Sequence, residues 1–314
     1  MKKRGKKNKK YKDIKKIKHK IKKTRKKQKK KSALRIGLFS IKKIKHKIKH
    51  IKTKSKETGM RTRKINKTRK TQEQKKIFIP VKNELELMIK SIKINNPGLP
   101  PEIEQAFRIV DRKFFVKHDP YSDEAKHIAF GQTISQPTTI ARMLKKIELR
   151  PGLDVLEIGT NTGYHAALAS WLVYPGQVTT IEIFQPLAEN AIKNINRFIE
   201  SLDKKERKKF EIQFVVGDAL DKENPIWKQK YDRIFFTAGV SKEHLPRVKE
   251  MGQSLLREDG LILFPTREFF DYGGLEVWQF RGGNLYLVSR EPGYAFVPLI
   301  HEKDLEEIYK VVKK

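Results

Sequence analysis

Short apolar runs alternate with helix-like segments through the second half of the chain. The run VLEI at residues 155–158 is typical of a fully buried parallel strand, and the good helix formers of HAALASWLV follow at 165–173. Further strand-like runs lie at 178–183, 210–218, 231–239 and 261–265. Because strands alternate with helices, the pattern predicts a mostly parallel sheet with helices on both faces.

Two flanking regions complete the predicted fold. Runs at 275–280 and 284–290 are joined by a short glycine turn, so we expect an antiparallel hairpin at one edge of the sheet. Before the sheet, ELELMIKSIK at 84–93 predicts an amphipathic helix. A second helix is expected from Pro101 onward. Its apolar side comprises Ile103, Phe107, Val110 and Phe114.

The turn from Gly159 to Gly163 joins the first strand of the sheet to its helix. Strand, glycine turn and helix is the unit that holds a nucleotide at a helix N-terminus. The spacing is G-x-x-x-G rather than G-x-G-x-x-G, and no phosphate-binding lysine follows. Glu157 and Glu182 end two successive strands and suit a ribose that needs carboxylate acceptors. The pattern favours a nucleoside without a phosphate chain, usually S-adenosylmethionine; the alternative is a tight turn in another α/β protein.

The charge is concentrated at the N-terminus. The 314 residues carry a net charge of +35, but residues 1–80 alone hold 37 Lys and Arg against 3 Asp and Glu, a net of +34. The remaining 234 residues hold 34 basic and 33 acidic side chains, a net of +1. The sequence therefore predicts a polycationic arm joined to a nearly neutral domain that is long enough to bury a full core.

Within the arm, IKKIKHKIK occurs twice, at 14–22 and 41–49, and places isoleucines on one side of a possible helix. One interpretation is a solvated low-complexity tail. The other is electrostatic adhesion to nucleic acid or to an anionic membrane surface. Apart from Tyr11 and Phe39 no aromatic side chains stand among the lysines up to residue 76, so stacking on bases is not supported. Translation from Met60 would remove most of the arm.

Several classes of protein are excluded by what the sequence lacks. There is no cysteine, which excludes disulfides, thiolate metal sites and cysteine nucleophiles. No run approaches the ~20 apolar residues of a membrane span, and no apolar segment follows the basic start as in a secretory signal. His118 and His127 lack the spacing of metal ligands, so we expect no metal. A cytoplasmic protein is expected.

The segment GQTISQP at 131–137 carries a resemblance to a known family. With ARM at 141–143, the glycine turn, VVGDAL, YDRIFFTAG, LREDGLILFP and FVPLI, residues 82–300 resemble the protein-L-isoaspartate (D-aspartate) O-methyltransferase family. The resemblance implies a Rossmann-like S-adenosylmethionine-dependent methyltransferase fold. Two positions depart from the family pattern: Asn161 replaces a glycine, and TREFFDYGG at 266–274 replaces a Gly and Gln segment.

This resemblance divides the chain into regions. Residues 1–80 form the lysine-rich arm, which the family pattern does not cover, and residues 81–314 form the methyltransferase domain. Within the domain, residues 81–150 are the helical lead-in with the substrate and active-site segment. Residues 151–300 are the cofactor-binding sheet.

Cofactor contacts are expected at the carboxyl ends of the strands, where such sheets bind ligands. Glu182 is expected to accept the ribose hydroxyls and Asp218 to face the adenine amine, with a backbone group from Ala219. Thr237 ends the next strand near the reacting methyl, although strand-end packing is nearly as good an explanation. Gly159 and Gly163 form the loop, with Glu157 just before it.

By similarity to the family, Ser135 orients the substrate carboxylate. Thr133 and Ile134 then line the site between cofactor and substrate, and FVPLI at 296–300 covers the substrate backbone. Helix capping is the alternative for Ser135. An α-carboxylate is already ionised at neutral pH, so methyl transfer to it needs no general base.

The predicted activity is transfer of methyl from S-adenosylmethionine to the free carboxylate of isoaspartyl residues, which is protein repair. Isoaspartyl-containing proteins and peptides are the expected partners, and a monomer is expected. The alternatives are a related carboxyl methyltransferase that acts on a dedicated peptide, a nucleic-acid methyltransferase, and a catalytically silent adaptor.

Overall fold

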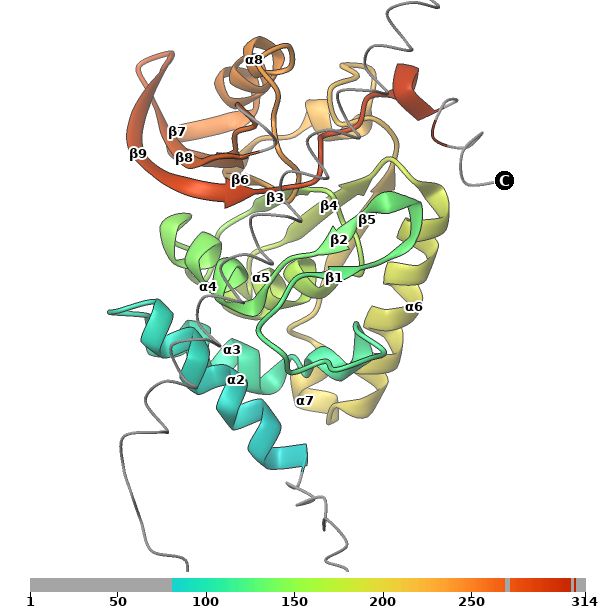
Figure 1. The fold of residues 1–314 in the computed structure, drawn as a ribbon. Coiled ribbons are helices and arrows are strands. Elements are labelled where there is room, and N and C mark those ends of the chain that lie inside the picture. The colour runs from blue at the N-terminus through green and yellow to red at the C-terminus, as the bar shows by residue number, and fades with distance from the viewer. Residues whose placement is uncertain (1–80, 269–271, 306–307, 309–314) are drawn as a thin grey trace, which may run out of the picture. The chain divides into compact units, whose positions relative to one another are not determined.

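The computed structural model describes residues 81–268, 272–305 and 308 (Figure 1). The expectations for the repeats at 14–22 and 41–49, and for a start at Met60, therefore lie outside the described residues. The centre of the altered loop, residues 269–271, lies outside them as well. The predicted domain boundary at residue 80 stays a prediction.

A seven-stranded sheet forms the centre of the fold, in the order β5-β4-β3-β6-β7-β8-β9. All pairs from β5 to β7 are parallel, whereas β7–β8 and β8–β9 are antiparallel. The strands are β3 (Val155–Ile158), β4 (Val178–Glu182), β5 (Ile212–Val216), β6 (Tyr231–Phe236), β7 (Leu256–Pro265), β8 (Tyr272–Arg281) and β9 (Asn284–Ala295). The predicted fold class, a mostly parallel sheet with an antiparallel C-terminal edge, is confirmed.

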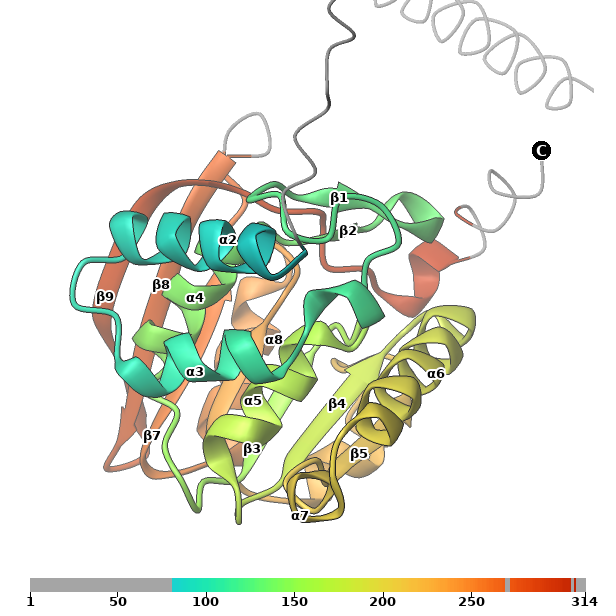
Figure 2. The same cartoon turned by 90° about the horizontal axis from the view of Figure 1, so that it is seen from below.

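Helices cover both faces of this sheet, and one of them, residues 164–173, is buried along almost its whole length. Figure 2 views the face covered by α2 (Val81–Asn95), α3 (Pro101–Ile109), α4 (Pro137–Lys146), α5 (Tyr164–Val173) and α6 (Gln185–Ser201). On the other face, α8 (Leu245–Leu255) and the 3-10 helix η3 (Pro225–Lys228) pack on a second apolar cluster. Short elements complete the fold: α7 (Lys204–Arg207), β1 (Lys126–His127), η2 (Ala129–Gly131) and β2 (Thr133–Ile134).

The second lead-in helix is shorter than its apolar pattern predicts. Helix α3 ends at Ile109, and the expectation that it extends to Phe114 is wrong. The Asp111 side chain accepts the backbone N–H of Lys113 at 3.0 Å and starts a new 3-10 turn, η1 (Arg112–Phe114). The turn buries Phe115 in place of Phe114, against the rings of Tyr164 and Phe198.

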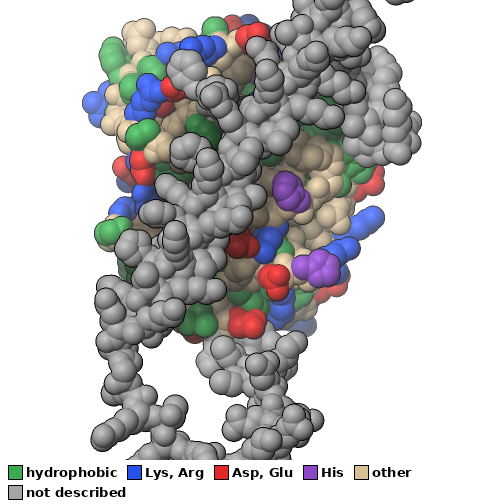
Figure 3. All heavy atoms as spheres, in the orientation of Figure 1, with side chains coloured by type: hydrophobic (Ala, Val, Ile, Leu, Met, Phe, Trp, Pro, Cys, Tyr) green, Lys and Arg blue, Asp and Glu red, His purple; other side chains and the backbone are tan. Residues whose placement is uncertain are grey.

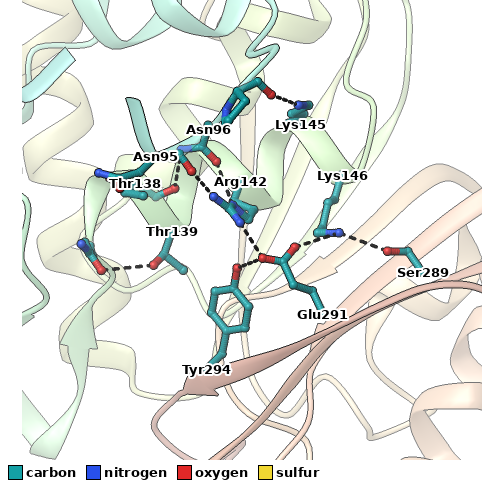
Figure 4. A network of polar contacts seen from close by, with 12 residues as sticks. Asn95, Asn96, Thr138, Thr139, Arg142, Lys145, Lys146, Ser289, Glu291 and Tyr294 are labelled. Atoms are coloured by element: carbon teal, nitrogen blue, oxygen red, sulfur yellow. Dashed lines mark hydrogen bonds and ion pairs between the residues drawn. The ribbon is translucent and has the colours of Figure 1, made fainter. Parts of the chain in front are cut away.

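A polar network ties the lead-in to the last strand (Figure 4). Arg142 in α4 donates to Asn96 after α2 and to Glu291 in β9, at 2.9 and 2.5 Å. Tyr294 donates to the same Glu291 carboxylate at 2.7 Å, and Lys146 pairs with it at 3.1 Å. Burial opposes ionisation, but these donors hold the pKa of Glu291 at about 2. The network therefore connects α2 and α4, which precede the sheet, to the last strand of the sheet.

The described surface has no single dominant sign of charge. On the face seen in Figure 3, the described Lys and Arg side chains lie among Asp and Glu side chains. This mixture agrees with the net charge of +1 over residues 81–314. The described residues include no helix long and apolar enough to cross a membrane.

A buried carboxyl lies in the centre of the sheet. Glu157 in β3 is fully buried, and its Oε2 accepts the hydroxyl of Thr180 at 2.6 Å. The Thr180 hydroxyl lies 2.7 Å from that of Thr160, whereas Glu157 Oε1 has no partner in the described structure. Burial raises the pKa of Glu157 well above its ordinary value of 4.5, and the charge of Glu182 adds to the rise. The fold therefore favours the protonated carboxyl.

Glu157→Gln is expected to stabilise the domain at alkaline pH. Because the folded pKa is raised, the contribution of Glu157 to stability is complete below about pH 4.5 and is lost as the pH rises through the folded pKa. Glutamine keeps the shape and stays neutral. The midpoint of thermal unfolding at about pH 8 should rise by at least 2–4 °C, roughly the effect of 1 kcal/mol in a domain of this size, and the gain should vanish near pH 4. An equal gain at both pH values, or a gain from the exposed control Glu189→Gln, would contradict this account.

Candidate active site

The loop after β3 is built on two glycines with left-handed backbone. Gly159 has φ 97°, and a Cβ there would lie 2.3 Å from Thr237 Oγ1 at the end of β6. The Thr237 hydroxyl donates to the Gly159 carbonyl at 2.7 Å. Gly163 has φ 87° and precedes α5, and a Cβ there would meet the side chain of Ile195 at 2.8 Å. Side chains are therefore excluded at both positions by close packing.

Asn161 occupies the centre of this loop, also with left-handed backbone at φ 58°. The expectation that asparagine can take the place of the family's glycine is met by this geometry. Its backbone N–H donates to Glu182 Oε2 at 2.8 Å. Its side-chain Nδ2 donates to the carbonyl of Thr133 at 2.8 Å, a bond that glycine could not make. One residue thus holds the strand-end carboxylate and the segment of Ser135 together.

Glu182 is nearly buried, and its carboxylate accepts two backbone N–H groups, from Asn161 and, at 3.1 Å, from Phe184. Burial raises the pKa of Glu182 above its ordinary value, while these N–H donors act in the opposite direction. Each carboxylate oxygen has a further acceptor position. The side chain therefore keeps acceptor capacity for a hydrogen bond from a ligand.

A cavity lies at the carboxyl ends of the parallel strands, with a volume of about 490 Å³ when its mouth is included. We call it the strand-end cavity. Its walls are mostly apolar, with the Glu182 carboxylate as the one acidic group among the described residues that line it. The lining is Gln132, Ile158, Gly159, Asn161, Ile181, Glu182, Ile183, Phe184, Gly217, Ala219, Thr237, Ala238, Val297, Pro298, Leu299 and Ile300. Four of the predicted cofactor residues, Gly159, Glu182, Ala219 and Thr237, line it.

A second, smaller cavity, of about 210 Å³ when the open space at its mouth is included, lies on the side of GQTISQP. We call it the inner cavity. It is lined by Thr133, Ile134, Ser135, Thr160, Asn161, Thr162, Tyr164, His165 and Thr237. Asn161 and Thr237 line both cavities, so the predicted cofactor and substrate residues meet there. Ser135 does not cap α4, whose N-cap is Gln136 without a side-chain hydrogen bond.

Three predicted residues are not in the lining of either cavity. Glu157 lies beneath the loop, and Gly163 starts α5. Asp218 accepts the backbone N–H groups of Leu220 at 2.8 Å and Glu302 at 3.0 Å. Its carboxylate therefore joins the end of β5 to the C-terminal segment, and an adenine contact from it stays a prediction.

Two segments remote from the sheet strands cover the strand-end cavity. Phe130 lies in the connection between the paired strands β1 and β2 and has left-handed backbone at φ 59°. The Phe130 ring stacks on Phe184, with centroids 4.9 Å apart and planes 13° apart. From the other side, residues 297–300 are held by hydrogen bonds of 2.7 and 2.9 Å between Gly239 and the backbone of Val297 and Leu299. The sequence pattern did not identify this aromatic pair.

The inner cavity contains a neutral histidine, and no acidic side chain is among the described residues that line it. Burial, assisted by the charge of Arg112, lowers the pKa of His165 to about 3. No three His, Asp or Glu side chains are grouped to hold a metal ion in the part of the chain that the structure describes. His118 and His127, which the sequence places outside any metal site, are exposed. The polar groups in the lining of the inner cavity are therefore mainly hydroxyl groups and a neutral imidazole.

Comparisons with known proteins agree on one family. The pattern of the protein-L-isoaspartate(D-aspartate) O-methyltransferase family matches residues 82–304. Among curated proteins, the protein-L-isoaspartate O-methyltransferase of Thermococcus onnurineus is 36% identical over 211 residues, which are 66% of this chain and 88% of that protein. The enzyme of the same name from Ignicoccus hospitalis is 35% identical over 208 residues, 64% of this chain and 90% of that protein.

Solved structures show the same fold. A putative protein-L-isoaspartate O-methyltransferase from Plasmodium falciparum, in complex with S-adenosyl-L-homocysteine, superposes with a TM-score of 0.57 at 23% identity. The match covers 70% of this chain and 97% of that chain. A second structure named protein-L-isoaspartate O-methyltransferase gives a TM-score of 0.58 at 24% identity, covering 72% and 69%. The chain therefore belongs to the protein-L-isoaspartate(D-aspartate) O-methyltransferase family.

Proposed function

We propose that this chain uses S-adenosylmethionine to methylate the free carboxylate of isoaspartyl residues in proteins and peptides, with the residues assigned below. One observation carries the assignment: the strand-end cavity and the inner cavity share Asn161 and Thr237, with the Glu182 carboxylate on one side and Ser135 on the other. A donor and an acceptor that occupy the two cavities would meet at Thr237. Family membership supplies the class of reaction.

The strand-end cavity fits the cofactor chemically. Glu182 keeps acceptor capacity for a ribose hydroxyl, and apolar residues of β4 and of 297–300 offer flat walls to an adenine ring. The absence of a side chain at Gly159 lets the loop close against Thr237. When bound, S-adenosylmethionine supplies a methyl group on a positively charged sulfur. Gly163 shapes the loop, while Ala219 lines the adenine side, with Asp218 behind it.

Residues of the inner cavity orient the acceptor. An α-carboxylate has an ordinary pKa of roughly 3.5 and arrives ionised, so no group has to remove a proton. The Ser135 hydroxyl donates a hydrogen bond that aims the carboxylate without neutralising it. Thr133 and the buried Ile134 line the path between donor and acceptor and exclude water. Placement of this kind can lower a barrier by about 7–11 kcal/mol at best.

The function is tested with labelled S-adenosylmethionine and three acceptors side by side: an isoaspartyl peptide, the matching aspartyl peptide and RNA. Base-labile methyl ester should form on the isoaspartyl peptide alone.

Ser135→Ala should lower turnover of that peptide by roughly 10- to 100-fold because the carboxylate is no longer aimed. Ser201→Ala, at the end of α6, is the matched control. Label in RNA, or only in the aspartyl peptide, would refute the proposal, and full turnover by Ser135→Ala would remove Ser135 from the mechanism.

Glu182→Ala should weaken cofactor binding. Loss of hydrogen bonds to a charged group is expected to raise the Kd for S-adenosylmethionine about tenfold to a hundredfold, measured by calorimetry. Glu189→Ala removes an exposed carboxylate of α6 and should leave the Kd unchanged. Unfolding of each variant is followed to confirm that the domain is intact. An unchanged Kd in Glu182→Ala would disprove the ribose contact.

A further partner is proposed for residues 1–80, because their net charge of +34 favours adhesion to polyanions. The full chain should bind RNA or phosphatidylserine vesicles at low salt, and the logarithm of the binding constant should fall linearly with that of the salt concentration. Binding that is absent at low salt, or that persists at high salt, would refute an electrostatic role.

We propose that the domain of residues 81–314 acts as a monomer in the cytoplasm, in keeping with a sequence without cysteine.

A further inference from the structure

A buried arginine that the proposed mechanism does not use lies behind Ser135. Arg112 is the first residue of η1, and none of its surface is exposed. Its Nη2 donates to the backbone carbonyl of Ser135 at 3.2 Å, and its guanidinium carbon lies 5.1 Å from the ring centroid of Tyr164. Its Nε and Nη1 have no hydrogen-bond partner in the described structure. A buried guanidinium therefore lies next to Ser135, the residue predicted to orient the substrate.

No carboxylate forms a direct ion pair with this guanidinium among the described residues, and the charge of Asp123 acts on it only from a distance. Asp111, the preceding residue, pairs with Lys113 at 2.6 Å and accepts the hydroxyl of Tyr121 at 2.8 Å. Asp123 accepts the hydroxyl of Ser91 and the backbone N–H of Thr138, each at 2.8 Å. Burial lowers the pKa of Arg112 by more than the charges of its neighbours raise it. A buried, unpaired cation is unfavourable, and a structural role alone does not account for it.

The polar groups around Arg112 also lack partners on the side of the inner cavity. Atoms of four residues in its lining are buried without a hydrogen bond in the described structure: Asn161 Oδ1, Thr162 Oγ1, Tyr164 OH and His165 Nε2. Together with Arg112, they account for most of the unpartnered buried polar atoms of the described side chains. Such a concentration indicates a place where a polar ligand completes the hydrogen bonding.

We propose that Arg112 is a positioning residue for the methyl acceptor, whose carboxylate, on entering the inner cavity, is the counter-ion that this buried guanidinium lacks. The inference rests on the proposed function, because it requires that Ser135 faces that carboxylate. Arg112 lies one peptide group away from the acceptor, because its hydrogen bond reaches the backbone carbonyl of Ser135. The inner cavity then selects an ionised acid over a neutral amide or ester.

The separation between Arg112 and the acceptor has a chemical reason. In methyl transfer a carboxylate oxygen forms a bond to the methyl carbon while the bond from that carbon to the positive sulfur breaks. A neutral ester and a neutral thioether result, so both charges are removed. A cation in direct contact with the acceptor would hold the lone pair that must attack. A cation one peptide group away attracts the acid by its field and leaves the attacking oxygen free. Arg112 should therefore act mainly on substrate affinity and little on kcat.

Arg112→Met tests the inference, with S-adenosylhomocysteine as an unreactive cofactor. Binding of an isoaspartyl peptide and of its methyl ester is compared by competition. Wild-type enzyme should prefer the acid, and the variant should lose this preference by about tenfold or more, the order expected for one charge several ångströms away at an effective dielectric constant of about 20. In turnover, KM for the peptide should rise with little change in kcat. Arg108→Met is the control, because it removes an exposed arginine of α3 that pairs with Glu86 in α2 and Glu104 in α3. This variant should keep the wild-type preference for the acid.

The unfolding temperature and the Kd for S-adenosylhomocysteine separate this role from a structural one. Because methionine removes a buried cation without a counter-ion, Arg112→Met should be at least as stable as wild type in the absence of peptide. A large loss of stability, or an unfolded variant, would show that the charge is already balanced and would overturn the inference. So would an unchanged preference for the acid, or an equal loss of affinity for acid and ester. A wild-type enzyme that methylates no isoaspartyl peptide would instead refute the proposed function.

Discussion

The arrangement of the site depends on the contact between Gly159 and Thr237. The two residues end adjacent parallel strands, and the Thr237 hydroxyl lies where a side chain on residue 159 would be. The contact presses the loop against the tip of β6 and leaves space on either side of Thr237. A Cβ at residue 159 would require the Thr237 hydroxyl to move, and with it the hydrogen bond that joins the loop to the tip of β6. A ligand site is thus defined here by close approach of backbone rather than by a large side chain.

The strands supply only part of the site, and the rest comes from the ends of the domain. Residues 133–135 precede the sheet and residues 297–300 follow it, yet both line cavities at the strand tips. The Arg142 and Glu291 network joins the segment before the sheet to β9. Residues 297–300 are held separately, by backbone hydrogen bonds to Gly239.

Much of this architecture follows from sequence patterns that have a direct physical cause. Apolar runs between helical segments identify the parallel strands, since both faces of such strands are buried. The end of α3 was misjudged because the apolar spacing continues past Ile109, whereas the Asp111 side chain starts a new turn. Glu182 and Ala219, at and beyond the ends of neighbouring parallel strands, line a cavity, and their contact with a cofactor stays a prediction. Asp218 shares that position in sequence, but one of its oxygens accepts the backbone N–H of Glu302, which lies 84 residues away, and spacing cannot reveal this contact.

Asn161 connects the linings of the two cavities by hydrogen bonds. Its backbone holds Glu182, which faces one cavity, and its side chain holds Thr133, which faces the other. Ordering of either neighbour by a bound molecule restricts Asn161 and so prepares the opposite side. By thermodynamic linkage, the factor by which the bound methyl donor changes the affinity for the acceptor equals the factor by which the bound acceptor changes the affinity for the donor. A relative with glycine at this position lacks the side-chain half of that connection and joins the two sides through its backbone alone.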